Sequence, residues 1–249
     1  DRDGSPYTTG GAVADTVTAL VGALALGYAL YHRQRTGIGQ HIDISMLESL
    51  LFADCTAMPY VAAHGGKSIH HRNGKQNTFQ FPMGVVKSNE GYISIHAPGE
   101  GKDSAWGRLC NIMDRVDLVD DPRYRTDRDR IDHTDEVVDI IERWLQDISD
   151  DEAALLVLAE ARISSGPVLS QSQILTHPYY RSRGTFQTVN YPEMGPIEVV
   201  APPYKFSETP AFVRGYAPQE GEHNEDILTS YLGFSSERIK DLMEQGVLY

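Results

Sequence analysis

The sequence is poor in cysteine. Only Cys55 and Cys110 occur in 249 residues, and they lie far apart in hydrophobic surroundings. A secreted domain held together by disulfides needs more cysteines at regular spacing, so that class of protein is excluded. We expect both thiols to be reduced and buried, in a cytoplasmic protein.

Positive charge is also scarce. Lysine and arginine number 22 against 35 aspartates and glutamates, which gives a net charge of −13 with histidine neutral. Nucleic-acid binding depends on clustered lysine and arginine, so this composition argues against a nucleic-acid partner. A phosphorylated small molecule remains compatible with it, because such a ligand requires only a local basic pocket.

A long apolar run of membrane-spanning length is missing as well. The stretch from Val17 to Tyr31 is apolar apart from Thr18, whereas a transmembrane helix needs about twenty such residues. Asp15 precedes the stretch and His32-Arg33 follow it. We therefore expect a helix buried in a protein core and no membrane partner. The first residues also lack an initiator methionine and an apolar signal segment.

What is present is a mixture of helical and strand patterns. Apolar residues at helical spacing predict helices, and short β-branched runs beside glycine and proline predict strands. The predicted helices are 15–33, 46–60, 103–117, 134–147, 150–161, 224–232 and 236–245. The predicted strand segments are 41–45, 81–88, 92–96 and the β-rich region 184–206, and residues 163–168 are predicted to form a turn or a strand. This alternation, without a regular βαβ series, indicates an α/β or α+β fold.

One carboxylate stands at the start of the first predicted helix. Asp15 precedes the apolar run, and Thr36-Gly37 supply a stop after the basic last turn. Aspartate is a good N-cap residue, and such a cap contributes about 1 kcal/mol to stability. Taken without other information, this position favours a structural role for Asp15.

Five stretches, in order, resemble the class III CoA-transferases, the family of formyl-CoA transferase. They cover nearly the whole chain at about the spacing of the family. The stretches are Ala14-Asp15 with His32-Arg33, Thr36 to Gln40 and Asp43 to Met46; Phe81 to Ile93 with Trp106 to Cys110; Asp121 to Tyr124 with Arg130; Ile163 to Val168 with His177-Pro178; and Ala217-Pro218 with Gly221 to His223 and Leu232-Gly233.

The resemblance implies a Rossmann-like large domain, incomplete in this chain, and a smaller α+β domain. It assigns 1–76 to the large domain with its catalytic helix, 77–180 to the small domain, and 181–249 to a segment that returns to the large domain. It also implies an interlocked homodimer. Asp3 to Pro6 resemble the loop just before the catalytic helix of the family. We therefore expect that an N-terminal part of the family fold, with much of its CoA pocket, is missing here.

The resemblance also implies a catalytic role for Asp15, with capping as a second duty. In the family, the aspartate at this place attacks the acyl-CoA carbonyl, and the reaction passes through an aspartyl-CoA thioester. The backbone amides of Thr16 and Val17 are the expected donors to the oxyanion. Gly74 and Lys75 lie near the place of the family's glycine-rich loop, without its run of glycines, and we expect them to bind coenzyme A.

The expected substrates are an acyl-CoA thioester and a small carboxylic acid, with no permanently bound cofactor and no metal. His70-His71 have no cysteine or acidic partner at metal-ligand spacing, so we expect a solvated loop there. Asp127 to Arg130 are expected to form a solvated charged face, with Arg130 a candidate for a structural partner, and Trp106 and Trp144 to lie in the core.

Two alternatives stay open. The family resembles α-methylacyl-CoA racemases, in which the equivalent aspartate moves the α-proton together with a histidine that would lie upstream of this chain. The other alternative is a truncated, non-catalytic family member that serves as an interaction partner. The residues do not identify which acyl-CoA and which acid would react.

Overall fold

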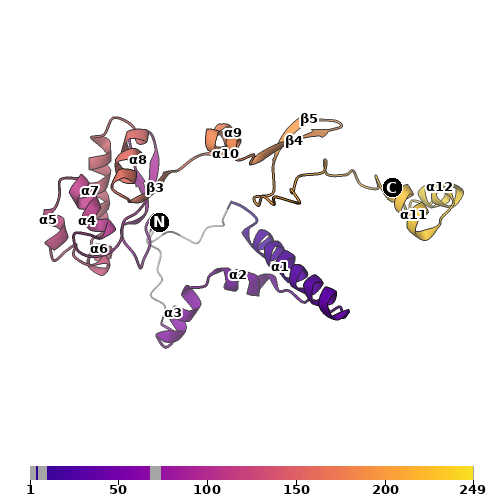
Figure 1. Cartoon of the computed structure of the whole chain (residues 1–249), viewed down its shortest axis with the longest axis horizontal. Helices are drawn as coiled ribbons and strands as arrows, with labels where there is room; N and C mark the ends of the chain where they lie inside the picture. The colour runs from indigo at the N-terminus through magenta and orange to yellow at the C-terminus, as the bar shows by residue number, and fades with distance from the viewer. Residues whose placement is uncertain (1–3, 5–9, 68–73, 249) are drawn as a thin grey trace. The chain divides into compact units, whose positions relative to one another are not determined.

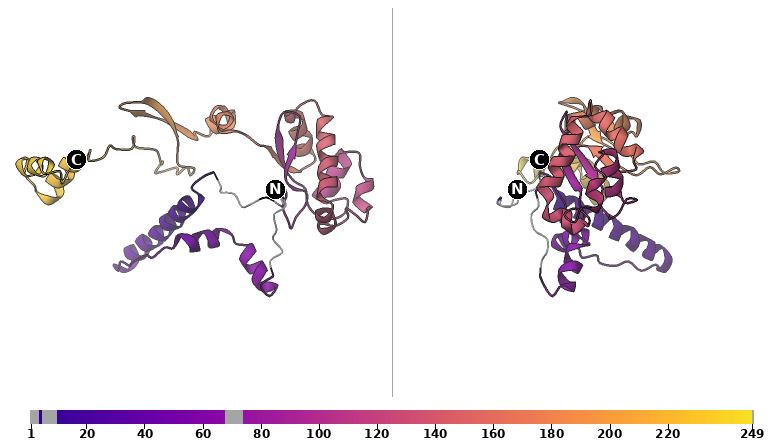
Figure 2. Two further views of the ribbon diagram at one scale, coloured as in Figure 1. Left: turned by 180° about the vertical axis from the view of Figure 1, so that it is seen from behind. Right: turned by 90° about the vertical axis from the view of Figure 1, so that its left-hand side faces the viewer.

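The computed structural model describes residue 4, residues 10–67 and residues 74–248. The chain divides into two compact units, residues 1–168 and 169–249, whose helices and strands carry the labels of Figure 1. Both units mix helices with antiparallel strands, as Figure 2 also shows. The mixed fold is therefore confirmed. The Rossmann-like sheet and the division at 1–76, 77–180 and 181–249 stay predictions.

The first unit begins with the long helix α1 (Val13–Thr36). It ends where the sequence predicted, because Gly37 adopts a left-handed φ of 75° and donates its N–H to Arg33 O at 2.8 Å. Glycine reaches this conformation without strain and so closes helices readily. The predicted stop at Thr36-Gly37 is confirmed.

Helix α1 is not the buried core helix that we predicted. Ala29 is its one buried residue, and Leu20, Leu24 and Tyr28 are 66%, 55% and 67% exposed. Among the described residues, α1 is the one helix long and apolar enough to cross a membrane, by length and composition alone. A helix that is apolar on all sides is normally covered by other protein or by lipid. The sequence of α1 does not show which of these covers it.

The segment that follows α1 is extended without being a strand. Residues 41–45 pair with no strand in the described part of the chain, so the strand predicted there is wrong. A β-rich segment needs a neighbour to accept its backbone hydrogen bonds. Ser45 is instead the N-cap of α2 (Met46–Ala53), and its side chain accepts a hydrogen bond from Glu48 N at 3.3 Å.

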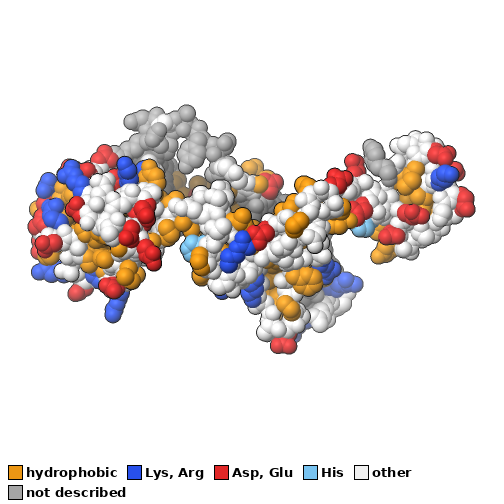
Figure 3. Space-filling model, turned by 90° about the horizontal axis from the view of Figure 1, so that it is seen from above, with side chains coloured by type: hydrophobic (Ala, Val, Ile, Leu, Met, Phe, Trp, Pro, Cys, Tyr) orange, Lys and Arg blue, Asp and Glu red, His pale blue; other side chains and the backbone are white. Residues whose placement is uncertain are grey.

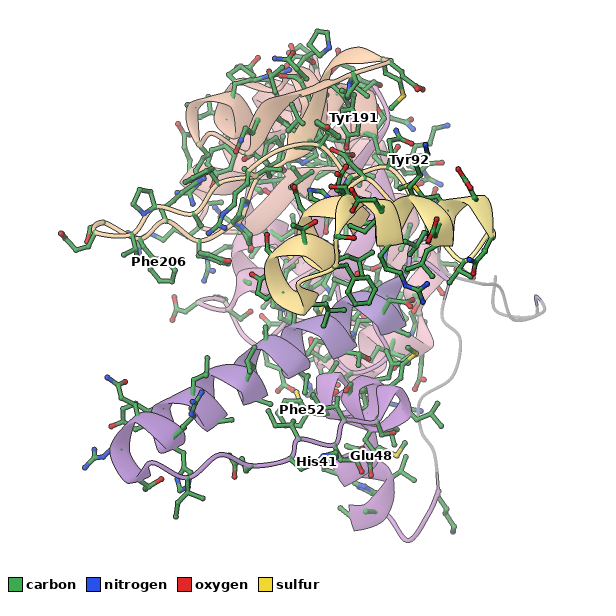
Figure 4. All side chains as sticks on the ribbon, turned by 90° about the vertical axis from the view of Figure 1, so that its right-hand side faces the viewer. His41, Glu48, Phe52, Tyr92, Tyr191 and Phe206 are labelled. Atoms are coloured by element: carbon green, nitrogen blue, oxygen red, sulfur yellow. The ribbon has the colours of Figure 1, made fainter. Side chains whose placement is uncertain are left out.

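The helix predicted over 46–60 is in fact two helices, α2 and α3 (Ala57–Ala63). The break falls at Asp54, whose side chain accepts a hydrogen bond from Ala57 N at 3.1 Å. Pro59 lies in the first turn of α3, where its missing N–H costs nothing, so it does not end the helix. Helix α2 packs against α1, and a groove of about 270 Å³ between them includes Phe52, seen with Glu48 and His41 in Figure 4.

Residues 81–167 form a compact body around a three-stranded sheet. Strands β1 (Met83–Lys87) and β2 (Tyr92–His96) pair antiparallel, and β3 (Ser164–Pro167) pairs with the other edge of β2. Ile93 and Ile95 of β2 point into the core, and their neighbours are exposed. The strand, turn and strand predicted for this region are confirmed.

Five helices complete the compact body: α4 (Ala105–Ile112), α5 (Asp117–Asp120), α6 (Asp127–Asp132), α7 (Thr134–Gln146) and α8 (Asp151–Glu160). Their buried core includes Phe81, Val86, Trp106, Leu109, Val137, Ile141, Leu145 and Leu158. The predicted helices 134–147 and 150–161 are confirmed. The helix predicted over 103–117 stops at Ile112, because Asp114 has a φ of 54° and leaves the right-handed helical region.

Arg130 is the one fully buried cation of the described residues. We expected a solvated charged face here with Arg130 as a candidate for a structural partner, and the second part is confirmed, because the Arg130 side chain is 0% exposed. Its Nε donates to Phe81 O at 2.8 Å, its Nη1 to Tyr124 O at 2.7 Å and its Nη2 to Gly99 O at 2.8 Å. One guanidinium therefore joins three loops that are far apart in the sequence.

Asp127 balances the charge of Arg130 through an ion pair. The same carboxylate accepts hydrogen bonds from Gly99 N at 3.1 Å and from Phe81 N at 3.4 Å. Burial lowers the pKa of Arg130, and the attraction of Asp127 opposes that shift. The Trp106 ring lies 4.8 Å from the guanidinium carbon, so the cation is also held over an aromatic face.

The two cysteines differ in environment, although both are free thiols. Cys110 is buried as predicted, and burial raises its pKa to about 12. Cys55 is exposed, so the prediction that both are buried is wrong for it. Cys55 lies in the connector between α2 and α3, which has no covering element in the described structure.

The second unit holds short helices and one hairpin. Strands β4 (Phe186–Tyr191) and β5 (Gly195–Val200) pair antiparallel, which confirms the β-rich region predicted there. The Gln187 side chain links β4 to Val213 by two hydrogen bonds. Gln187 Nε2 donates to Val213 O at 2.6 Å, and Val213 N donates to Gln187 Oε1 at 3.0 Å. The helices of this unit are α9 (Gln171–Thr176), α10 (Pro178–Ser182), α11 (Asn224–Leu232) and α12 (Ser236–Glu244), of which the sequence predicted the last two.

Substitution of Arg130 tests the role of the buried cation. Arg130→Met removes the donor to the carbonyl groups of Phe81, Gly99 and Tyr124 and the cation that pairs with Asp127. We therefore expect the compact body to lose about 3–5 kcal/mol of stability. Trp106 and Trp144 are the two tryptophans of the chain, and both lie in the compact body. Tryptophan fluorescence during urea unfolding therefore measures this change.

Arg128→Met is the matched control, because Arg128 lies on the same helix but is 72% exposed in its ion pair with Asp132. An exposed pair contributes no more than about 1 kcal/mol. Equal losses in the two variants would contradict the role given to Arg130.

Candidate functional site

Asp15 is the third residue of α1. The N-cap is Ala12, which makes no side-chain cap hydrogen bond, so the prediction that Asp15 is the N-cap is wrong. The Asp15 side chain is exposed and has no hydrogen-bond or ion-pair partner among the described residues. It lies in the first turn of α1, where the helix dipole stabilises negative charge.

The amides expected to face an oxyanion are already engaged. Thr16 N donates to Ala12 O at 3.0 Å, and the N–H of Val17 belongs to the regular hydrogen bonds of the helix. The amides of Ala14 and Asp15 precede the first position that has an acceptor within the helix. The donors that α1 offers to a ligand are therefore those of Ala14 and Asp15, not those of Thr16 and Val17.

Gly74 and Lys75 lie on the compact body beside β1. Gly74 has a left-handed φ of 64°, which favours glycine at this position. Lys75 O accepts a hydrogen bond from Val85 N at 3.0 Å, and Lys75 Nζ lies 4.4 Å from the centre of the Tyr92 ring, labelled in Figure 4. The remainder of this loop, with His70-His71, lies outside the described residues.

Gly84 allows this segment to dock on β1, a role that we did not predict. A Cβ atom at Gly84 would lie 2.1 Å from Lys75 O and 2.7 Å from Gln76 Oε1. Gln76 Nε2 also donates to Val85 O at 2.9 Å, and Asn77 N donates to Met83 O at 2.7 Å. A glycine inside a predicted strand was the available signal, since such a glycine often marks a close backbone approach.

A cavity of about 520 Å³ lies next to this segment. The Tyr60 ring of α3 lies 5.1 Å from the Phe79 ring at one side of it. The other lining residues are Thr56, Asn77, Gln80 and Met83, so none of the described lining carries a formal charge. The described part of the lining offers apolar and amide surface to a ligand.

The described structure does not bring the predicted site residues together. No hydrogen bond, ion pair or ring contact joins Asp15 to Gly74 or Lys75 in the described ranges. Within those ranges there is also no group of three or more histidine, cysteine, aspartate or glutamate side chains placed to hold a metal ion. Asp15 and the 74–77 segment are thus two separate parts of a candidate site.

The profile of CoA-transferase family III matches residues 1–224 of this chain. The match covers most of the sequence, and the chain therefore belongs to that family. The resemblance drawn from the five sequence stretches is confirmed.

Three relatives are named CoA-transferases. The chain is 28% identical to the succinyl-CoA–L-malate CoA-transferase beta subunit of Chloroflexus aurantiacus, over 98% of this chain and 60% of the relative. It is 31% identical to the succinyl-CoA:mesaconate CoA-transferase of Haloarcula hispanica, over 91% and 55%. It is 27% identical to the formyl-CoA:oxalate CoA-transferase of Bradyrhizobium diazoefficiens, over 99% and 62%. The chain thus spans about three fifths of the length of these relatives.

Two crystal structures share the fold. A CaiB/BaiF family protein from Brucella suis aligns with a TM-score of 0.71 and 24% identity, over 91% of this chain and 57% of the other. A hypothetical protein from Mycobacterium tuberculosis aligns with a TM-score of 0.70 and 22% identity, over 92% and 58%. At these identities the likeness establishes the architecture of the chain, not its reaction.

Substitution of Gly84 tests how the 74–77 segment is held. In Gly84→Ala the added methyl group meets Lys75 O, and overpacking of this kind costs about 1–3 kcal/mol. We expect hydrogen exchange at Val85 N–H to accelerate by about tenfold or more. Gly91→Ala is the control, because a Cβ at Gly91 has no atom within 4 Å. Unchanged exchange at Val85 in Gly84→Ala would show that the segment is not held this way.

Proposed function

We propose that this chain is part of an acyl-CoA:carboxylate CoA-transferase that works through Asp15. The observation that carries the proposal is the family match over residues 1–224, joined by relatives that are all named for CoA transfer between carboxylic acids. Asp15 supports it further, because its carboxylate is exposed and has no partner in the described structure. An unpaired carboxylate is available as a nucleophile.

The reaction exchanges a thioester for a carboxylate in balanced steps. An Asp15 oxygen attacks the acyl-CoA carbonyl carbon, the C–S bond breaks, and the CoA thiolate leaves a mixed anhydride on Asp15. The thiolate then attacks the Asp15 carbonyl carbon, which releases the first acid and forms an aspartyl-CoA thioester. The incoming carboxylate attacks that thioester and expels the thiolate. The thiolate finally attacks the acyl carbon of the new anhydride, which frees the new acyl-CoA and Asp15.

The start of α1 would assist these steps electrostatically. Each attack places negative charge on a carbonyl oxygen, and the amides of Ala14 and Asp15 lie at the positive end of the helix. Lys75 would supply a positive charge to the phosphate groups of coenzyme A, because its ammonium group is exposed beside the Tyr92 ring. Gly74 would let the backbone turn toward that ligand with its left-handed φ. The CoA thioester is then a substrate rather than a resident cofactor.

A second copy of the chain is part of this proposal. Leu20, Leu24 and Tyr28 of α1 are exposed, and hydrophobic side chains reach the surface in Figure 3. Several exposed apolar side chains on one helix are typical of protein interfaces, and an interlocked homodimer would cover them. Because both cysteines are free thiols, we also propose that the protein is cytoplasmic.

Replacement of the proposed nucleophile tests the reaction. In the protein with any flanking sequence that its gene encodes, Asp15→Asn should lower CoA exchange between succinyl-CoA and a panel of carboxylic acids by at least about a thousandfold, because an amide cannot form the anhydride. Glu48→Gln is the matched control, since Glu48 is the third residue of α2 and is exposed. Full exchange activity in Asp15→Asn would refute the proposal.

The racemase alternative predicts a different product. Incubation of a 2-methylacyl-CoA in deuterium oxide without an acceptor acid should leave its α-carbon unlabelled if the protein is a transferase. Deuterium uptake there that is lost in Asp15→Asn would favour proton transfer by Asp15 instead. If the protein shows neither CoA exchange nor deuterium uptake, that result would favour a non-catalytic family member.

The dimer is tested by mass in solution. We expect light scattering to give twice the mass of one chain, and Leu24→Glu to lower that mass because it buries a charge in an apolar interface. Leu156→Glu is the control, since Leu156 is 61% exposed on α8 of the compact body. A single-chain mass for the unsubstituted protein would contradict the dimer, and recovery in the membrane fraction would point to a lipid cover for α1.

A further inference from the structure

A separate cavity of about 300 Å³ lies in the compact body. It is bounded by the loop before α4, by α4 and α5, and by the end of α8. The lining residues are Lys102, Gly107, Arg108, Asn111, Ile112, Val116, Val119 and Ala161. The predicted site residues Asp15, Gly74 and Lys75 are not among them.

The walls of this cavity are fixed by backbone contacts. Gly107 brings α4 so close to the preceding loop that a Cβ would lie 2.4 Å from Lys102 O. Arg108 then ties α4 to the end of α8, with Nε donating to Ala161 O at 2.8 Å and Nη2 to Arg162 O at 3.0 Å. The cavity is therefore formed in advance of any ligand, as small-molecule sites usually are.

The floor of the cavity is apolar and its rim carries one available cation. Ile112, Val116 and Val119 supply the floor, and Val116 is 45% exposed although it is aliphatic. Lys102 is exposed at the rim and has no ion-pair partner in the described part of the chain. The Asn111 side chain likewise makes no hydrogen bond within the described ranges.

Acidic side chains flank Lys102 in the sequence at Glu100 and Asp103, but neither forms an ion pair with it in the described part of the chain. Among the described residues, none of those that line the cavity is aspartate or glutamate. The nearby Asp117 is paired with Arg115 at 2.8 Å. Arg108 directs its guanidinium to backbone carbonyl groups rather than to the cavity. Of the two cations among the described lining residues, Lys102 is therefore the one available to pair with a ligand.

We propose that this cavity binds a small amphiphilic monocarboxylate. Its carboxylate would accept hydrogen bonds from Lys102 and Asn111, and its hydrocarbon part would cover Ile112, Val116 and Val119. A cavity of about 300 Å³ is at the lower end of the range for small-molecule sites. A phosphate ion would leave the apolar floor in water, and a dicarboxylate would bring a second charge without a second cation. The inference does not rest on the proposed transferase reaction.

Titration with hexanoate tests the site. Methyl NMR of the full chain should show saturable shifts for Ile112, Val116 and Val119, and smaller changes elsewhere. Hexanol should bind about fivefold more weakly, because it lacks the charge that Lys102 would pair with. Inorganic phosphate should leave these methyl groups unchanged. Equal binding of hexanol, or shifts spread over both units of the chain, would overturn the proposal.

Two variants separate the charge from the apolar floor. Lys102→Glu should weaken hexanoate binding by at least about tenfold through repulsion, and Val116→Ser should weaken hexanoate and hexanol alike. Lys240→Glu is the control, with the same charge change on exposed α12. Both altered residues are exposed, and the methyl spectrum of each variant verifies its fold. Unweakened hexanoate binding in Lys102→Glu and Val116→Ser would also overturn the proposal.

Discussion

The buried guanidinium of Arg130 is the interaction on which the compact body depends. It receives no water, so its hydrogen bonds to carbonyl groups at 81, 99 and 124 must replace hydration fully. Those bonds fix the loop that leads into β1, and β1 in turn carries the segment with Gly74 and Lys75 through Val85. A structural cation in the core thereby determines where one part of the candidate site is displayed.

The other part of the candidate site depends on surfaces that the described chain leaves uncovered. Asp15 lies on a helix whose apolar sides are largely exposed. A carboxylate in water is a weak nucleophile, and a catalytic group gains most from an environment that excludes water. In the proposed account, the surface that covers α1 also encloses Asp15. Association and chemistry then become linked, because both need the same cover.

The sequence predicted local structure better than burial. The turn at Gly37, the hairpin of β1 and β2 and the helices α7 and α8 follow from glycine stops and apolar periodicity. The strand predicted at 41–45 is wrong because strand pairing is not a local property. The predicted burial of α1 is wrong because composition does not reveal which partner covers a helix. Arg130 and Arg128 are neighbours in one charged run, yet one is buried and the other exposed. Only the packing of α6 on the core distinguishes them. Asp15 was reached through family resemblance, since its local pattern favoured a cap.

The measurement that tests the central claim most directly is hydroxylamine trapping during turnover. The protein, with any flanking sequence that its gene encodes, is incubated with succinyl-CoA and then treated with hydroxylamine. It is then digested, and the masses of its peptides are measured by mass spectrometry. Hydroxylamine attacks an acyl or thioester carbonyl, so an aspartyl-CoA intermediate predicts a hydroxamate on Asp15. Turnover that continues with Asp15 unmodified would contradict the account.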